Sequence, residues 1–156
     1  MGRQHSYATV TTWTGNLGTG TSTYRGYSRD HELTADGVPA IQGSSDPSFR
    51  GDPARWNPEQ LLLTSLASCH MLSYLHLCAV NGIVVTEYVD RSTGTMEQAG
   101  DGGHFAEVTL HPEVTIDDAD KLELAESLHT EAHKNCFIAA SVNFPVRHEP
   151  RITVNP

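Results

Sequence analysis

The chain has 156 residues, of which 38% are hydrophobic and 19% charged, a composition that predicts one folded domain over residues 1–156 and excludes a disordered chain. It carries 19 acidic residues against 10 Lys and Arg, a formal net charge of -9. Because phosphate contacts need clustered cations, this balance argues against nucleic acid as a partner. Its 3 cysteines form no disulfide framework, and the polar first residues predict no signal peptide, so we expect a reducing, cytoplasmic location.

The first third of the chain alternates strand formers with turn residues. Residues 7–13 are rich in Thr, Val and aromatic side chains and predict a strand, and Asp36-Gly37 is typical of a hairpin turn. Residues 43–58 hold Gly, Ser, Asp and Pro, which predicts a loop. Asn57 as N-cap and Pro58 in the first turn then predict the start of a helix.

This helix is predicted over residues 58–80 and ends at Asn81-Gly82, a good C-terminal signal. Its leucines cover more than one face, which predicts a buried helix at the centre of the fold, part of it covered by a partner chain. Serine and histidine side chains interrupt the apolar stretch, so we expect no membrane span.

Alternating apolar positions dominate the next segment. Residues 83–98 and 103–116 each predict a strand, and the glycine-rich turn at 100–103 predicts that the two form an antiparallel hairpin.

The last segment predicts a helix over residues 119–134, capped by Asp117 or Asp118, then a short helical turn after Cys136 and a strand over 142–146. The order of elements indicates an α+β fold in which antiparallel sheet packs against a central helix.

Two of the cysteines are candidates for a reactive thiol. Cys69 lies in the middle of the predicted long helix, and Cys136 follows the second helix. Cys78 is nine residues from Cys69, a rise of ~13 Å along a helix, so these two thiols cannot pair within it. A reactive thiol must be held as the thiolate, for which arginine is the best donor of positive charge. The candidate arginines are Arg25, Arg29, Arg50 and Arg55.

Several short segments resemble one known family. Residues 57–62 (Asn-Pro-Glu-Gln-Leu-Leu) and 67–69 (Ala-Ser-Cys), followed by Cys136 and residues 139–142 (Ala-Ala-Ser-Val), resemble the signature of the OsmC/Ohr family, the osmotically inducible protein C and organic hydroperoxide resistance proteins. The resemblance extends over roughly residues 13–150. The sequence around the second cysteine is more similar to the OsmC-like members than to Ohr proteins.

The resemblance implies an intertwined homodimer, with antiparallel sheets wrapped around long central helices. It also implies a thiol-dependent peroxidase for organic hydroperoxides that acts in oxidative stress defence, needs no bound cofactor and is recycled by an external dithiol. Cys69 would be the peroxidatic thiol, Cys136 the resolving thiol that forms a disulfide with it, and Glu59 the carboxylate that holds a catalytic arginine. Ohr proteins carry that arginine in a Gly-Gly-Arg motif, which is absent here; Arg25 and Arg29 both stand in its place.

Glu59 precedes Cys69 by ten residues, or ~15 Å of helix rise, so it would serve the thiol across a dimer interface. An acidic residue in the first helical turn also has a simpler role, because it stabilises the helix dipole.

Three other functions remain open from the sequence. His129, His133 and Cys136 fall at helical spacing and could bind a metal ion. A cysteine hydrolase would pair Cys69 or Cys136 with a histidine such as His70 or His133. A non-catalytic dimer that binds a small ligand would use its cysteines only as core residues.

Overall fold

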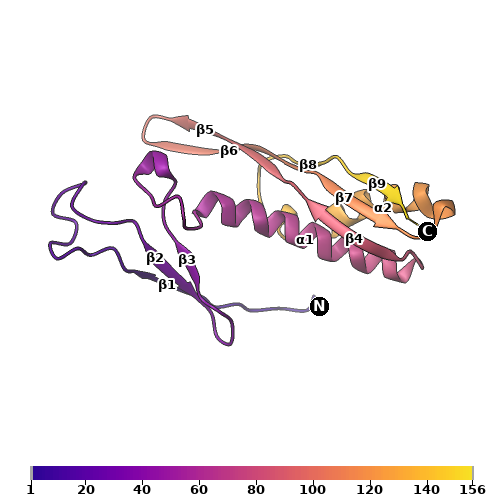
Figure 1. Ribbon diagram of the computed structural model, residues 1–156, viewed down its shortest axis with the longest axis horizontal. Helices are drawn as coiled ribbons and strands as arrows, with labels where there is room; N and C mark the ends of the chain where they lie inside the picture. Colours follow the sequence, from indigo (N-terminus) through magenta and orange to yellow (C-terminus); the bar gives the residue numbers. More distant parts are fainter. Residues whose placement is uncertain (1, 156) are drawn as a thin grey trace. The chain divides into compact units, whose positions relative to one another are not determined.

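A computed structural model describes residues 2–155 of the chain (Figure 1). The chain groups into two compact units, residues 2–61 and residues 62–155, and the division falls in the first turn of the long helix. The single domain predicted over residues 1–156 stays a prediction.

The first unit contains a small antiparallel sheet in the order β1-β2-β3, formed by Val10–Trp13, His31–Thr34 and Ile41–Gly43. Gly37 in the β2–β3 turn has a φ of 77°, a left-handed conformation that glycine adopts without steric cost. The turn predicted at Asp36-Gly37 is therefore confirmed. After β3 the chain follows a loop that contains one 3-10 turn, Pro47–Phe49.

Helix α1 runs from Pro58 to Val80, the range that the sequence predicts. Its N-terminus is closed by a reciprocal pair: the Gln60 amide N–H donates to Asn57 Oδ1 at 2.8 Å, and the Asn57 amide N–H donates to Gln60 Oε1 at 3.1 Å. The helix ends at Gly82, whose φ of 66° lets the Ile83 amide donate to the Cys78 carbonyl at 2.9 Å. Both helix ends thus follow from local sequence chemistry.

The burial of α1 differs from the expectation. Only Leu66, His70, Tyr74 and Cys78 are buried, one residue per turn along a single face, whereas Leu72 keeps 63% of its surface exposed. The expectation of a helix buried nearly all round is therefore wrong for one chain alone. By length and composition α1 could also cross a membrane, a property that it shares with the core helices of soluble proteins.

Two three-stranded sheets form the second unit, in the orders β4-β7-β9 and β5-β6-β8. Their strands are Val85–Asp90 (β4), Thr93–Ala99 (β5), Gly102–Leu110 (β6), Pro112–Ile116 (β7), Val146–His148 (β8) and Arg151–Val154 (β9).

The predicted hairpin exists as β5 and β6, which pair in antiparallel fashion. The prediction of two long strands over 83–98 and 103–116 is wrong. The first is broken at residues 91–92 and the second at His111. The break sends β4 to pair with β7 and leaves β5 and β6 in the other sheet. The α+β class is confirmed, and the antiparallel pairs of the second unit are joined by two parallel ones that were not predicted, since β8 runs parallel to β6 and β9 parallel to β7.

Helix α2, Leu122–Asn135, follows a 3-10 turn whose first amides are capped by the Asp118 carboxylate. A second short turn, Ala139–Ser141, follows Cys136 as expected. The strand predicted over 142–146 lies later, as β8 at Val146–His148, and β9 follows it. Val142 and Phe144 alternate because they pack against the core around Leu66, and they pair with no strand.

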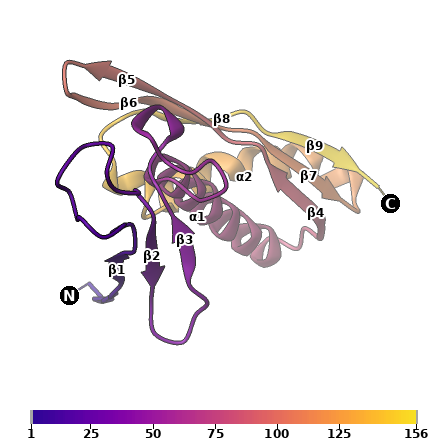
Figure 2. The same ribbon diagram turned by 60° about the vertical axis from the view of Figure 1, so that its left-hand side comes forward.

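The main core lies where α1 and α2 meet the sheet of β4, β7 and β9 (Figure 2). It combines Tyr74 and Cys78 of α1 with Ala125, Leu128 and Ala132 of α2, and the strands add apolar side chains such as those of Val114 and Ile116. This packing determines where the end of α2, and with it Cys136, lies beside α1.

Candidate active site

Cys69 and Cys136 come together although 67 positions separate them in the chain. Cys69 projects from the middle of α1, and Cys136 is the residue at which α2 ends, with its amide donating to the His133 carbonyl at 3.2 Å. The thiol of Cys136 lies within hydrogen-bonding reach of Cys69, and both thiols are free. The structure therefore places side by side the two cysteines that the sequence singled out.

The two thiols have different environments. Cys69 is half-buried, whereas only 1% of the Cys136 surface is exposed. Burial, together with the hydrogen bond to Cys69, raises the pKa of Cys136 to about 11, against smaller opposing effects that include the Ala139 amide N–H, which donates to its sulfur at 3.4 Å. Cys136 is thus a protonated, covered thiol at neutral pH, and Cys69 is the thiol that solutes can reach.

An open groove of about 550 Å³ is lined by residues close in the chain to the two cysteines, although neither cysteine is among its lining residues. On α1 it is lined by Leu72, Ser73 and His76, which share a helix face with Cys69 because they follow it by three, four and seven residues. Its other wall includes Asn135 and Phe137, the neighbours of Cys136 in the chain.

The groove is more apolar than polar, and 75% of the Phe137 surface is exposed. This surface suits an alkyl or aryl group brought close to the two sulfur atoms.

Cys78 is separate from this site. It lies in the main core beside Tyr74, only 1% exposed, and burial raises its pKa. A thiol in such surroundings is inert.

Glu59 occupies the first turn of α1, where a carboxylate favours the helix dipole. One of its carboxylate oxygens, Oε2, is buried and has no hydrogen-bond partner among residues 2–155. A buried carboxylate oxygen without a donor is costly, so this position is suited to a cation from outside the described contacts.

The two candidate arginines lie in the first unit and differ in how they are held. Arg29 donates to the carbonyls of Tyr24 and Tyr27, each at 2.7 Å, and its guanidinium lies over both rings at 4.5 and 4.0 Å from their centroids. Arg25 is exposed. Neither forms an ion pair within the described chain, whereas Arg55 approaches the carboxylates of Asp30 and Asp52.

A cluster of histidines that sequence analysis did not anticipate lies in the core beside the thiol-bearing segments. His70 and His129 are 1% and 0% exposed, and their rings share a hydrogen bond of 3.0 Å between Nε2 and Nδ1. Tyr74 stacks on His129 with ring centroids 3.8 Å apart, and His148 lies 5.6 Å from the centroids of both His70 and His133.

Burial, with smaller contributions from the neighbouring imidazoles, lowers the pKa of His70 to about 4 and that of His129 to about 3. Both rings are therefore neutral at physiological pH. The spacing of His70 with Leu66, Tyr74 and Cys78, four residues apart each time, was the available sequence signal for a buried stripe.

This arrangement speaks against two of the alternative functions. No group of three or more His, Cys, Asp or Glu side chains within residues 2–155 is arranged to hold a metal ion, so His129, His133 and Cys136 do not form the metal site considered above. His70 is hydrogen-bonded to His129 and not to Cys69, so the structure does not show the cysteine–histidine pair that hydrolysis requires.

Comparison with known proteins supports the assignment of the fold. A family model described as OsmC-like protein matches residues 51–151. The chain is similar to an OsmC-like protein of unknown function from Vibrio cholerae, with 30% sequence identity and a TM-score of 0.85 over 95% of this chain and 100% of that one. No match was found among curated proteins.

Two more distant solved structures share the fold. An organic hydroperoxide resistance protein from Elizabethkingia anophelis is 17% identical, with a TM-score of 0.70 over 99% of this chain and 100% of that one. An organic hydroperoxide resistance protein of Bacillus subtilis is 20% identical, with a TM-score of 0.61 over 94% of this chain and 98% of that one.

The buried histidines lead to a testable prediction about how the free energy of unfolding depends on pH. Because the pKa of His70 and His129 in the folded chain lies below the ordinary value of 6.5, the unfolded chain takes up protons first as the pH falls. The free energy of unfolding should therefore fall between pH 6.5 and about 4, by up to about 1.4 kcal/mol per pH unit for each histidine. Urea denaturation between pH 7.5 and 5, above the range where most carboxylates titrate, measures this.

The variant His5→Gln removes an exposed histidine and should leave the slope unchanged. A free energy of unfolding that stays constant from pH 6.5 to 5 in the unmodified protein would contradict the neutral histidine pair.

Proposed function

The chain belongs to the OsmC-like protein family, and we propose that it is a thiol-dependent peroxidase that reduces organic hydroperoxides to alcohols. The observation that carries the proposal is the meeting of a half-exposed thiol, Cys69, with a buried one, Cys136, beside an apolar groove. Solved structures of the same fold include proteins described as organic hydroperoxide resistance proteins, and these support a reaction with organic hydroperoxides.

The reaction balances with these two thiols and one external dithiol. The Cys69 thiolate attacks the distal oxygen of the hydroperoxide, the O–O bond breaks, and the alkoxide takes up a proton and leaves as the alcohol. Cys69 is then a sulfenic acid. The Cys136 sulfur attacks it, a disulfide forms and water leaves. A reduced dithiol restores both thiols by exchange, which fits the reducing cytoplasm in which we place the protein.

The environments of the two thiols support this division of roles. Cys69 is reached from solvent, as a peroxidatic thiol must be. Cys136, with its pKa raised to about 11, stays protonated and does not compete for peroxide. Because it already contacts Cys69, it can trap the sulfenic acid before a second peroxide oxidises it further.

The groove supports an organic substrate. Leu72, Leu77 and Phe137 would bind the alkyl or aryl group of a hydroperoxide, which hydrogen peroxide lacks. Apolar burial is worth roughly 25 cal/mol per Å², so even partial burial of such a group favours the organic substrate.

The site also needs a cation, and we assign that role to an arginine held by Glu59. The buried Glu59 Oε2 has no partner among residues 2–155, and a guanidinium would satisfy it through a bidentate pair. Arg25, which is exposed and unpaired within the described chain, and Arg29, which already donates to two carbonyls, are the two candidates.

A homodimer fits the exposed part of α1. Val80 and the following Val84 have more than half of their surface exposed, and solitary apolar side chains are common but neighbouring exposed ones at a helix end are not. A second copy of the chain would cover this part and bring its own Glu59 from a different direction.

Substitution of the cysteines one at a time separates their roles. We expect Cys69→Ser to abolish consumption of cumene hydroperoxide, because the nucleophile is lost. Cys136→Ser should consume one equivalent and stop at the sulfenic acid, since no resolving thiol remains. Dithiol-coupled turnover and mass spectrometry of the protein give both results.

Cys78→Ala is the matched control, because Cys78 lies in the core away from the groove, and it should retain the activity of the folded protein. Unchanged peroxide consumption in Cys69→Ser would overturn the proposal and favour the non-catalytic ligand-binding dimer.

The arginine assignment is tested by charge-neutral variants. Arg25→Gln, Arg29→Gln and Glu59→Gln are compared by the rate of alkylation of Cys69 as a function of pH. The catalytic arginine is the one whose loss slows the alkylation of Cys69 at neutral pH and lowers kcat/KM by about tenfold or more, roughly the effect of one lost charge-assisted contact. Arg151→Gln, at an exposed position of β9, serves as the control. If no arginine variant changes either quantity, the assigned role is wrong.

Sedimentation equilibrium tests the dimer. The unmodified chain should sediment at twice the monomer mass, and Val80→Glu should weaken association because it places a charge on the exposed apolar end of α1. Thr95→Glu, on an exposed position of β5, should not. A monomer at micromolar concentration would contradict the dimer and leave the thiol chemistry to be judged separately.

A further inference from the structure

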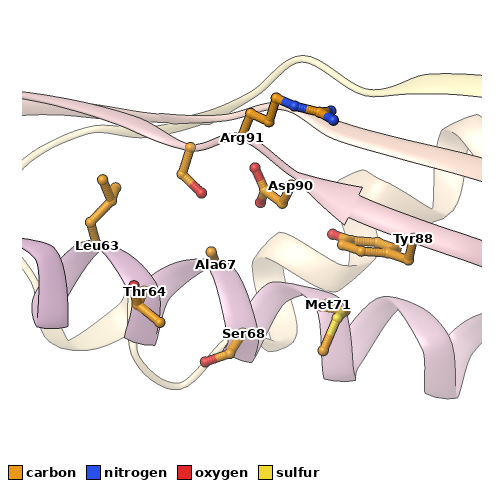
Figure 3. Close-up of a pocket in the computed structure, with 9 residues that line it drawn as sticks. Leu63, Thr64, Ala67, Ser68, Met71, Tyr88, Asp90 and Arg91 are labelled. Atoms are coloured by element: carbon orange, nitrogen blue, oxygen red, sulfur yellow. The ribbon is translucent and has the colours of Figure 1, made fainter.

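A second pocket lies against another side of α1 (Figure 3). Its volume is about 400 Å³, and its walls are α1 on one side and the end of β4 on the other. Ala67, a small side chain at the middle of the α1 wall, leaves the space open. Ala67 and Cys69 are two positions apart, about 200° around the helix, so this pocket and the thiols face different directions.

Two buried polar atoms of β4 border the pocket without a partner. Asp90 Oδ2 and Tyr88 Oη have almost no accessible surface and make no hydrogen bond with any described residue, so a ligand in the pocket touches them only after displacing the side chains that cover them. Figure 3 shows the Tyr88 hydroxyl and the Asp90 carboxylate facing the space above Ala67. An unsatisfied buried polar atom costs about 1–3 kcal/mol, so two of them in one pocket indicate a group that satisfies both.

Both side chains are held in place by the rest of the structure. Asp90 Oδ1 accepts a hydrogen bond from the His111 amide at 2.8 Å, which fixes the carboxylate and leaves Oδ2 directed elsewhere. The ring of Tyr88 lies 6.0 Å from that of Tyr74, a core residue. The two polar atoms are therefore a preformed feature of the second unit.

Asp90 is the one acidic side chain among the lining residues, and Arg91 is the one basic side chain. The guanidinium of Arg91 pairs with Glu113 at 2.8 Å. No Lys, Arg or His within residues 2–155 forms an ion pair with Asp90. Burial raises the pKa of Tyr88, and the negative charge of Asp90 raises it further, so the hydroxyl remains neutral beside a carboxylate.

We propose that this pocket binds a small organic cation in which a primary ammonium is joined to a short alkyl or aryl group. The ammonium donates to Asp90 Oδ2 and Tyr88 Oη, the two orphaned atoms. The apolar group lies against Leu63, Ala67 and Met71 of α1. A neutral alcohol could satisfy one of the two atoms but not the charge, and a carboxylate would be repelled by Asp90.

Calorimetric titration with hexylammonium, hexanol and hexanoate tests the proposal on the full chain. We expect hexylammonium to bind with one site per chain, and hexanol and hexanoate to bind at least about tenfold more weakly, a difference of about 1.4 kcal/mol. Asp90→Asn should weaken hexylammonium binding by a similar factor while its amide oxygen still accepts from His111.

The control Asp101→Asn removes one acidic charge from the exposed β5–β6 turn and should leave binding unchanged. This separates a site from general attraction to a chain of net charge -9. Equal weakening by the two substitutions would overturn the proposal, as would equal binding of hexanol and hexylammonium, or no binding of hexylammonium at all.

Ala67→Leu provides a second variant that does not alter polar groups. Its larger side chain fills the pocket, so hexylammonium binding should be lost while the far-ultraviolet circular dichroism is retained. If that variant is unfolded, Tyr88→Phe takes its place, and here binding should weaken because one acceptor is gone. Unchanged hexylammonium binding by the folded variant tested would overturn the proposed location. Cys69→Ser should bind hexylammonium as the unmodified chain does, whatever its peroxidase activity.

Discussion

The packing of α2 against α1 is the constraint on which the second unit depends. Tyr74 stacks on His129 at 3.8 Å, His129 hydrogen-bonds to His70 at 3.0 Å, and the Tyr74 hydroxyl donates to the Ala125 carbonyl at 2.9 Å. These contacts fix α2 along α1 and therefore fix where α2 ends. Since Cys136 is the residue at which it ends, polar contacts in the core set the approach of the two thiols. Their cost is that two imidazoles must stay neutral while buried.

The same packing makes the two cysteines chemically different. Cys136 is buried at the end of α2 while Cys69 stays half-exposed, so burial raises the pKa of one thiol and the other remains accessible. Two equally exposed thiols would compete for the oxidant. Two equally buried thiols would both be out of its reach. The asymmetry thus arises because Cys136 lies at the end of α2, whereas Cys69 lies on α1 between its core face and the groove.

Each side of helix α1 has a different role. Leu66, His70, Tyr74 and Cys78 face the core, the face shared by Cys69, Leu72 and His76 borders the groove, and Ala67 faces the pocket closed by Tyr88 and Asp90. This division explains why α1 is apolar nearly all round although its own chain buries only one residue in each turn. An apolar helix need not be buried by its own chain; its remaining faces are available to ligands or to a second copy.

The local features of the fold follow from neighbouring residues in the chain. Asn57 and Gly82 set the ends of α1, Asp118 capped the turn before α2, and the segments around Glu59, Cys69 and Cys136 indicated the OsmC family, because caps, turns and short motifs depend on neighbouring residues. Only the tertiary structure decided which strands pair, since the break at His111 and the parallel additions of β8 and β9 join residues far apart in the chain. It also decided that His70 meets His129, that Cys136 is buried, and that Tyr88 and Asp90 face Ala67, because burial and long-range contacts are properties of the packed chain and not of any local pattern.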